Sequence, residues 1–200
     1  MHAKPTQILA QEHQVILQVL ECLEKMADEA AAGRLDGGSA REAVEFFRGF
    51  ADRCHHGKEE VHLFPAMEAK GYSPECGPTA VMRQEHELGR THIRGMDESI
   101  AAAAEGDRQA LERFVRNARA YLVLLRQHID KEDHCLFPMA DQALSENDQH
   151  FLLGLFARVE DEEMGAGTHE RFVAIAERLA DRYGVAKTTP AGAGCCGHQQ

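Results

Sequence analysis

Two motifs of this 200-residue chain recur at the same distance along the sequence. Gln11-Glu12-His13 returns 73 residues later as Gln84-Glu85-His86. With the same offset, His55-x-x-Lys58-Glu59-x-x-x-Leu63-Phe64-Pro65 returns as His128-x-x-Lys131-Glu132-x-x-x-Leu136-Phe137-Pro138. Because no insertion separates the copies, the repeat predicts two halves of the same local structure, related by a pseudo-twofold axis. The fold must therefore place two equivalent sets of His and Glu in equivalent positions.

The composition of the long segments is typical of helices. Ala, Leu, Glu, Arg, Gln and Met dominate them, and no β-branched run alternates with polar residues. Gly and Pro divide the chain into helices predicted at 6–32, 40–69, 78–104, 108–142 and 147–183, the last one broken at Gly165-Ala166-Gly167. The prediction is an all-α fold, an up-down-up-down four-helix bundle with an additional C-terminal helix. We expect one domain over 1–184, with its bundle core at 6–142 and its C-terminal helix at 147–183, and a flexible tail at 185–200.

The apolar face of each bundle helix also carries histidine or glutamate. His and Glu four residues apart lie one turn apart on the same helix face, so an HxxxE pair can direct both side chains at one ion or at two neighbouring ions. A buried carboxylate is unfavourable unless it is paired or coordinates a metal. The pattern therefore predicts a dinuclear metal site made of the six repeat-matched residues His13, His55, Glu59, His86, His128 and Glu132.

The ligand types favour some metals over others. Mixed imidazole and carboxylate ligation suits iron, manganese or zinc, whereas calcium and magnesium prefer oxygen and structural zinc more often uses thiolates. We expect iron, with manganese or zinc as alternatives. The Glu-x-x-His pairs of ferritin-like dinuclear bundles occur only once here, as Glu59-x-x-His62, because the residue equivalent to His62 is Cys135.

The motifs resemble those of the hemerythrin-like family, the HHE cation-binding domains, over roughly residues 6–142. The likeness rests on their order: His13, then His55-His56-x-x-Glu59-Glu60 with Leu63-Phe64-Pro65, then His86, then His128-x-x-x-Glu132 with Leu136-Phe137-Pro138. The resemblance implies an oxo- or hydroxo-bridged di-iron centre with Glu59 and Glu132 as bridging carboxylates and the four repeat-matched histidines as terminal ligands. One iron is expected to keep an open position for a small ligand.

Two features depart from the oxygen-carrying hemerythrins, whose motifs resemble HxxxE, HxxxH and HxxxxD. The residue four after His86 is Arg90, so one imidazole is missing; His56 can fill that place, although its repeat mate is Ile129. Asp133 completes an HxxxxD spacing and competes with Glu132 for the bridge, but the repeat favours Glu132. The predicted ligands are therefore His13, His55, His56, Glu59, His86, His128 and Glu132.

Fewer histidines and more oxygen ligands than in the carrier proteins indicate redox turnover rather than reversible oxygen transport. The resemblance implies a protein that binds or reacts with dioxygen, hydrogen peroxide or nitric oxide in oxidative or nitrosative stress, as an enzyme or as a sensor. The alternatives are iron handling and repair of iron centres without turnover. The repair proteins of this kind carry an N-terminal cysteine module, which this sequence does not show.

Charge and cysteine usage exclude other classes of protein. A net charge of −11 repels phosphate backbones and anionic lipids, so we expect neither nucleic acid nor a membrane as a partner. No signal peptide or apolar run of spanning length is present in the sequence. Three of the six cysteines lie inside helical patterns, so we expect a reducing, cytoplasmic location rather than a disulfide framework: Cys22, Cys54 and Cys135.

The remaining polar residues are assigned to less specific roles. Glu12 and Glu85 are expected on exposed helix faces, with a hydrogen bond to a ligand histidine as the alternative. Tyr121 is expected to fill the core, with a place beside the metal as the alternative. Four more side chains are expected in solvent or behind the ligands: Glu60, His62, His92 and His134. Near the C-terminus, Glu163 and His169 are expected on a packing helix with a glycine break, with a lid or an extra ligand as the alternative. Cys195-Cys196 is a weak candidate for metal binding or redox chemistry in the tail.

Overall fold

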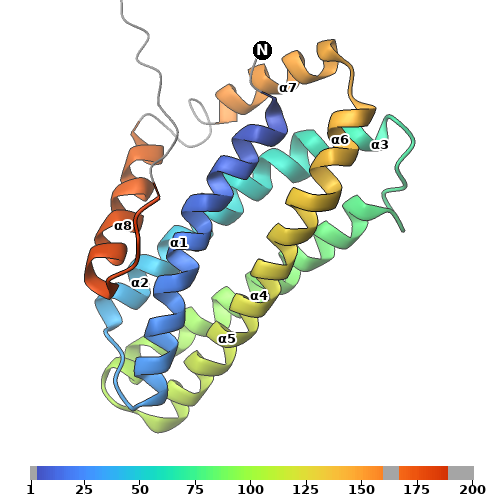
Figure 1. Cartoon of the computed structure of the whole chain (residues 1–200). Coiled ribbons are helices and arrows are strands. Elements are labelled where there is room, and N and C mark those ends of the chain that lie inside the picture. The colour runs from blue at the N-terminus through green and yellow to red at the C-terminus, as the bar shows by residue number, and fades with distance from the viewer. Residues whose placement is uncertain (1–3, 160–166, 189–200) are drawn as a thin grey trace, which may run out of the picture.

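Four long helices run up and down side by side in the computed structural model of this chain (Figure 1). The structure describes residues 4–159 and 167–188. The first and third bundle helices are α1 (Pro5–Ala31) and α4 (Pro78–Ala104). The second runs without a break through α2 (Gly37–Phe46), η1 (Phe47–His56), η2 (Glu59–Leu63) and α3 (Phe64–Glu68). The fourth consists of α5 (Arg108–Lys131), η3 (Glu132–Leu136) and α6 (Phe137–Ala143), where η marks a π-helical segment.

Two shorter helices complete the fold. The helix α7 (Glu146–Arg158) crosses one end of the bundle, and α8 (Thr168–Tyr183) packs along α1 and α2 (Figure 1). The prediction of an all-α bundle with an additional C-terminal helix is confirmed, and the described ranges contain no strand. The expected break at residues 165–167 falls almost wholly outside the described residues, which resume at Gly167.

The start of the second helix differs from our prediction. We placed it at residue 40 because Gly37-Gly38 resembled a break, whereas the helix begins at Gly37. The carboxylate of Asp36 accepts hydrogen bonds from the backbone N–H groups of Gly38 and Ser39, at 2.8 and 3.1 Å. An N-cap of this kind satisfies the free donors of the first turn, so the two glycines are tolerated inside it.

The core consists of two apolar clusters with a polar layer between them. The larger cluster lies in the main body of the bundle and includes Phe46, Phe114 and the inner face of α8. The smaller one, at the α7 end, includes Leu9, Phe64, Phe137 and Phe156. The buried histidines and glutamates on the bundle helices belong to neither cluster. This arrangement surrounds the polar layer with hydrocarbon on both sides.

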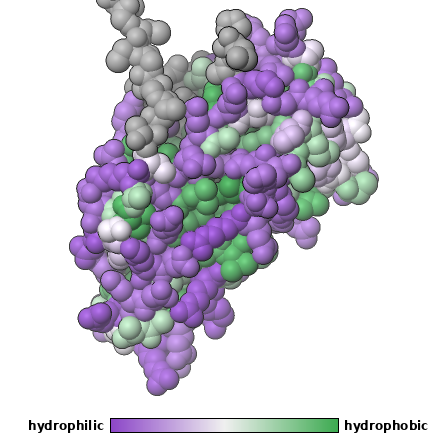
Figure 2. Space-filling view, in the orientation of Figure 1, coloured by the Kyte–Doolittle hydropathy of each residue, from purple (hydrophilic) through white to green (hydrophobic). Residues whose placement is uncertain are grey.

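The outer surface is mainly polar. The face shown in Figure 2 is largely hydrophilic, with narrower hydrophobic bands between the helices. None of the described helices combines the length and apolarity required to cross a bilayer. At the C-terminal end, Thr188 donates hydrogen bonds to the Gln18 side-chain oxygen of α1, so residues 185–188 lie against the bundle; the rest of the predicted tail is outside the described residues.

Candidate metal centre

The two HxxxE motifs lie where the second and fourth bundle helices widen into π turns. Glu59 opens η2 and Glu132 opens η3, and Pro65 and Pro138 follow in the first turns of α3 and α6. Proline has no backbone N–H and its ring clashes with the carbonyl one turn earlier, so the regular α-helical ladder cannot run through it unchanged. A π turn accommodates this break, and such turns occur frequently at functional sites.

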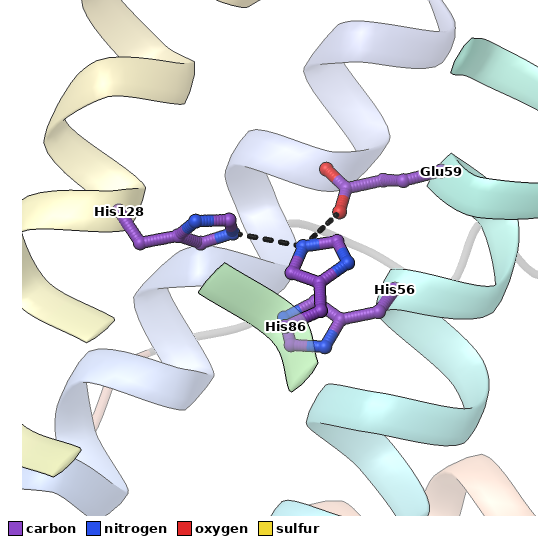
Figure 3. Close-up of side chains that lie close together, drawn as sticks. All are labelled: His56, Glu59, His86 and His128. Atoms are coloured by element: carbon purple, nitrogen blue, oxygen red, sulfur yellow. Dashed lines mark hydrogen bonds and ion pairs between the residues drawn. The ribbon is translucent and has the colours of Figure 1, made fainter. Parts of the chain in front are cut away.

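The structure brings all seven predicted ligands together in the polar layer. Their donor atoms form two groups, in each of which four atoms lie within 4.8 Å of one another. The first group is His13, His55, Glu59 and Glu132, and the second is His56, Glu59, His86 and His128. Figure 3 shows the second group, with Glu59 and His128 both directed at the same nitrogen of His86. Because Glu59 belongs to both groups, it lies where a bridging ligand would.

Both central carboxylates join the two halves of the repeat. The two oxygens of Glu132 lie 3.1 Å from Nε2 of His13 and 3.1 Å from Nε2 of His128. Those of Glu59 lie 3.7 Å from Nε2 of His55 and 3.5 Å from Nε2 of His86. All four oxygens are buried and have no hydrogen-bond partner of good geometry among the described residues. Buried carboxylates without partners are rare in proteins unless a cation compensates them.

Each repeat-matched histidine is held from behind by an outer carboxylate. The Nδ1–H groups donate hydrogen bonds at 2.6–2.9 Å in four pairs: His13 to Asp133, His55 to Glu12, His86 to Glu60 and His128 to Glu85. A carboxylate only accepts hydrogen bonds, so the proton of the neutral ring is on Nδ1 and Nε2 presents a lone pair. This is the arrangement in which proteins orient histidines toward metals.

The lone pairs of these histidines face one another. Nε2 of His13 lies 3.0 Å from Nε2 of His55, and Nε2 of His86 lies 3.0 Å from Nε2 of His128. While the rings are neutral and their Nδ1 protons are engaged elsewhere, neither pair can be joined by a hydrogen bond, and the facing lone pairs repel. Without a metal ion, and against the effect of burial, the neighbouring carboxylates raise the pKa of His13 and that of His128, the latter to about 9, so a proton then occupies part of the space of the cation. A cation bound to each pair turns this repulsion into coordination, so the donor set fits two metal ions.

The electrostatics of the central pair agree with this fit. Burial, together with the neighbouring Glu132, raises the pKa of Glu59 well above its usual range. Burial alone would also raise the pKa of Glu132, but His128 and His13 hold it well below its usual range. The protein groups by themselves therefore favour only one ionised carboxylate of the two, and both become favourable when positive charge lies between them.

Our sequence reasoning gave the outer carboxylates too little weight: it left Glu60 either in solvent or behind the ligands, treated Asp133 only as a competitor of Glu132, and preferred exposed positions for Glu12 and Glu85. Glu12 and Glu85 were predicted on exposed faces, and this is wrong: Glu12 is 5% exposed, and both accept hydrogen bonds from histidines. Glu60 and Asp133 are also repeat mates, 73 residues apart. Asp133 bonds to the back of His13 rather than joining the central carboxylates, so Glu132 holds the position for which the two compete. The repeat contained the signal, because all four residues recur with the same offset.

Two lysines extend the repeated arrangement outward. Lys58 donates to Glu12 and Lys131 donates to Glu85, each from the HxxKE motif that supplies the histidine. Burial by itself raises the pKa of Glu12, but the hydrogen bond from His55 and the Lys58 ammonium bring it down to about 2. Lys58 is fully buried, whereas the side chain of Lys131 is 40% exposed. The two halves are therefore equivalent in connectivity but not in burial.

His56 makes the two halves chemically unequal. Its ring stacks on His86 with centroids 3.7 Å apart, and its Nδ1 lies 3.4 Å from Asp52. Arg90 donates to Asp52 and to Glu60, both at 2.9 Å, so it holds two of the carboxylates behind the second group of ligands. The repeat mates of His56, Asp52 and Arg90 are apolar: Ile129, Leu125 and Leu17. Only one half of the site can therefore offer a third imidazole.

The other sequence candidates lie outside the two groups. His169 packs its ring against Phe50 at 5.6 Å, and His134 is exposed beside Asp130. Tyr121 is buried on the inner face of α5. The described cysteines are free thiols: Cys22, Cys54, Cys76 and Cys135. Glu163 and Cys195-Cys196 fall outside the described residues.

Comparison with known families agrees with the geometry. Residues 4–140 match the model of the hemerythrin HHE cation binding domain, so the chain belongs to the hemerythrin family of metal-cation-binding domains. It is also 26% identical over 179 residues to uncharacterised proteins of Mycobacterium tuberculosis and Mycobacterium bovis. The match covers 86% of this chain and 66% of those relatives, slightly under two thirds of their length. No solved structure gave a significant match.

Proposed function

We propose that this protein is a cytoplasmic non-haem di-iron protein that binds or reacts with dioxygen, hydrogen peroxide or nitric oxide in oxidative or nitrosative stress. His13, His55, Glu59 and Glu132 hold one iron. His56, His86 and His128, again with Glu59 and Glu132, hold the other. The observation that carries the proposal is the convergence of four Nε2 lone pairs and four unpartnered carboxylate oxygens in one buried layer.

The chemistry of the donor set supports iron. Imidazole with carboxylate suits iron, manganese and zinc, and the described part of the site includes no thiolate. Two adjacent irons supply two-electron exchange with a small ligand bound at an open coordination position. The outer carboxylates of this chain keep the imidazoles in the required orientation, and the apolar clusters on both sides exclude bulk water.

The unequal halves indicate where an external ligand binds. The group containing His13 and His55 has two imidazoles, and the group containing His56 has three. The ion with fewer protein ligands keeps the free position, so the His13 side is the better candidate for coordination of the oxidant. The fully buried Lys58 adds a fixed positive charge behind this side through Glu12 and His55.

Elemental analysis of protein purified without added metal, with an absorption spectrum before and after hydrogen peroxide, tests the proposal. We expect about two irons per chain, near-ultraviolet charge-transfer bands, and spectral changes on oxidation. Absence of iron, or a single zinc, contradicts it.

Peroxide consumption separates turnover from iron handling. Disappearance of peroxide that depends on the bound irons and repeats over many equivalents indicates an enzyme. A single stoichiometric oxidation indicates a sensor or an iron-handling protein, and a redox-dependent change in partner binding identifies the sensor.

A further inference from the structure

One arginine side chain connects two of the outer carboxylates. Arg90 lies on α4, one turn after His86, and its Nε and Nη2 atoms donate hydrogen bonds at 2.9 Å to Asp52 and Glu60 of the second bundle helix. Asp52 in turn faces Nδ1 of His56 at 3.4 Å, and Glu60 accepts from Nδ1 of His86 at 2.6 Å. A single guanidinium therefore reaches two imidazoles of the second group, each through one carboxylate.

This contact requires the shape of arginine. A guanidinium offers several N–H donors in one rigid plane, so it can hold two carboxylates in a fixed relative position, whereas a lysine ammonium is a point charge on a flexible stem. The side chains of Arg90, Asp52 and Glu60 are only 27%, 24% and 25% exposed. At this depth water and salt screen the ion pairs less than they do at the surface. The arrangement is therefore better suited to fixing side chains than a surface ion pair is.

The first group of ligands has no such clamp. Asp133 is the repeat mate of Glu60, and it accepts a hydrogen bond from a ligand histidine, His13. In the part of the chain that the structure describes, Asp133 makes no ion pair with a lysine or an arginine. The residue equivalent to Arg90 is Leu17, which packs against the larger apolar cluster. Arg90 is therefore a difference between two otherwise corresponding supports.

Such supports determine how much order a metal ion has to impose when it binds. The buried Lys58 gives the first group one firm support, behind His55. In the second group Arg90 holds two carboxylates at once, and the rings of His56 and His86 are already stacked, with centroids 3.7 Å apart. Ligands that are fixed before binding lose less conformational entropy, so the ion is bound more tightly. The second group is the better prepared of the two.

We propose that Arg90 is a positioning residue that prepares the second group of ligands, so that this group is the first of the two to bind a metal ion. The inference rests on the proposed function in one respect, since it takes these histidines as metal ligands. The first group then fills second and exchanges its ion more readily. The protein is therefore expected to hold one ion before it holds two.

The order of filling can be followed with zinc, which requires no redox change. The metal-free full chain, with ¹⁵N-labelled histidines, is titrated with zinc at one fixed pH. During the first equivalent the ring signals of His56, His86 and His128 are expected to shift, and during the second equivalent those of His13 and His55. Simultaneous shifts in both groups, the reverse order, or no zinc binding overturns the proposal.

Arg90→Leu installs the residue that the first half has at the equivalent position, Leu17. With a competing chelator present, this variant should bind zinc at the second group about 10- to 100-fold more weakly than wild type, the loss typical of removing a support behind metal ligands. Arg90→Lys keeps the charge but not the two-carboxylate contact, so it should not restore wild-type affinity. Arg94→Leu, at an exposed position one turn further along α4, is the matched control. Wild-type affinity in Arg90→Leu, or in Arg90→Lys, overturns the positioning role.

Two further measurements separate positioning from general stabilisation. If urea unfolding shows that Arg90→Leu lowers the stability of the metal-free protein while its zinc affinity is unchanged, the proposal is overturned. In the His56→Ile variant, Arg90→Leu should reduce the affinity of the second group by a smaller factor than in wild type, because one of the two imidazoles through which Arg90 acts is already absent. An equal factor in both proteins overturns the action of Arg90 through His56. Failure of the wild type to hold iron contradicts the proposed function instead, and the zinc titration still decides on Arg90.

Discussion

Glu59 and Glu132 are the residues whose burial is hardest to explain by packing alone. Their oxygens lie between four imidazoles, have no hydrogen-bond partner among the described residues, and belong to side chains with no exposed surface. Replacing an uncompensated buried charge with an apolar group of similar size is often stabilising. The same replacement must be harmful once a cation depends on the carboxylate. Whether the replacement raises or lowers the stability of the protein therefore shows whether a cation is bound to the carboxylate.

Glu59→Met tests this reversal. After treatment with a chelator, the variant is expected to be more stable than wild type by on the order of 1–3 kcal/mol. In the metal-loaded state it should have a lower melting temperature and a lower metal content than wild type. Urea unfolding and elemental analysis of the same two proteins, with and without chelator, measure both effects. A variant that retains the full metal content would remove Glu59 from the centre.

Lys58 and Lys131 make the same kind of contact to a glutamate, but Lys58 is buried and Lys131 is partly exposed. Lys58→Met leaves Glu12 charged in a buried position, and breaking a buried pair in this way costs about 3–5 kcal/mol. Lys131→Met removes the equivalent contact to Glu85 at a half-exposed position, for which about 0–1 kcal/mol is expected. Urea unfolding of the chelated proteins measures the difference. Equal losses would show that the burial of Lys58 has no energetic consequence.

Glu12 makes the stability of the metal-free protein depend on pH in the acidic range. Its pKa of about 2 in the folded protein lies below the ordinary value of 4.5, so its contribution is complete above about pH 5 and is lost as the pH falls toward 2. The full contribution is on the order of 3 kcal/mol. The double variant Glu12→Gln/Lys58→Met removes both charges and should lose less stability than wild type between pH 5 and pH 3. Parallel pH profiles of the two proteins would contradict this linkage.

The clustering of the inner histidines and glutamates could be predicted at this scale, whereas the hydrogen bonds of Glu12 and Glu85 to these histidines were only an alternative. His and Glu on an apolar helix face are unusual, and the repeat excluded coincidence. Glu12, on the other hand, is one position along the helix from His13, and a sequence does not show which helix packs over that position. Its burial accompanies the approach of Lys58 from another helix, whose ammonium group in turn lies over the ring of Phe156. Only the recurrence of Glu12 at Glu85 could have indicated a shared role.

The helices were predicted well where Gly or Pro ends them and less well where the winding changes. The limits of α4 agree with the prediction. Pro78 starts the helix, and Gly106, whose backbone is in the left-handed conformation, forms the turn just after its C-terminal end. The π-helical segment η1 was not predicted. It has no counterpart in the second half, where residues 120–129 are α-helical, and it is the segment on which the adjacent residues His55 and His56 both become buried. No residue pattern alone distinguishes such a segment from an α-helix.

The close approach of α8 to η1 depends on one glycine. A Cβ atom on Gly49 would lie 1.9 Å from the ring of Phe172, which also packs against Phe46 and Phe50. Gly49→Ala should therefore destabilise the protein by about 1–3 kcal/mol, because the ring cannot keep its position. Gly57→Ala, in the same bundle helix, should stabilise it by about 0.5–1 kcal/mol, since the position is helical and unobstructed.

Hydrogen exchange locates the Gly49 effect. In Gly49→Ala the amides of α8 should exchange faster than in wild type, while those of α4 should keep their protection. In Gly57→Ala both helices should exchange at wild-type rates. Unchanged exchange in α8 of the Gly49→Ala variant would mean that the helix does not depend on this contact.

At the scale of the whole molecule, the repeated architecture contains two groups of candidate metal ligands that differ from each other. The bundle, the π turns at Glu59 and Glu132 and the outer carboxylates obey the repeat, which is why the family and the clustering of the histidines and glutamates could be predicted from the sequence. The third imidazole and its Asp52 and Arg90 supports occur in one half only. They are additions to a symmetric frame. Two identical halves would bind two ions with equal affinity. A metal-binding curve with two different affinities would therefore show the effect of these one-sided residues.

His56→Ile gives the first half the residue that the second half has at the equivalent position, Ile129. Loss of this imidazole should lower the binding affinity for one of the two ions by at least 10- to 100-fold, the loss typical of removing a supporting contact. The affinity for the other ion should stay close to that of wild type. Stepwise metal titration of the metal-free protein, followed by elemental analysis after dialysis, should show one retained and one easily lost ion. His134→Ile, at an exposed position outside both groups, serves as the control. If His56→Ile holds two ions as tightly as wild type, His56 is a packing residue and the two halves bind metal equivalently.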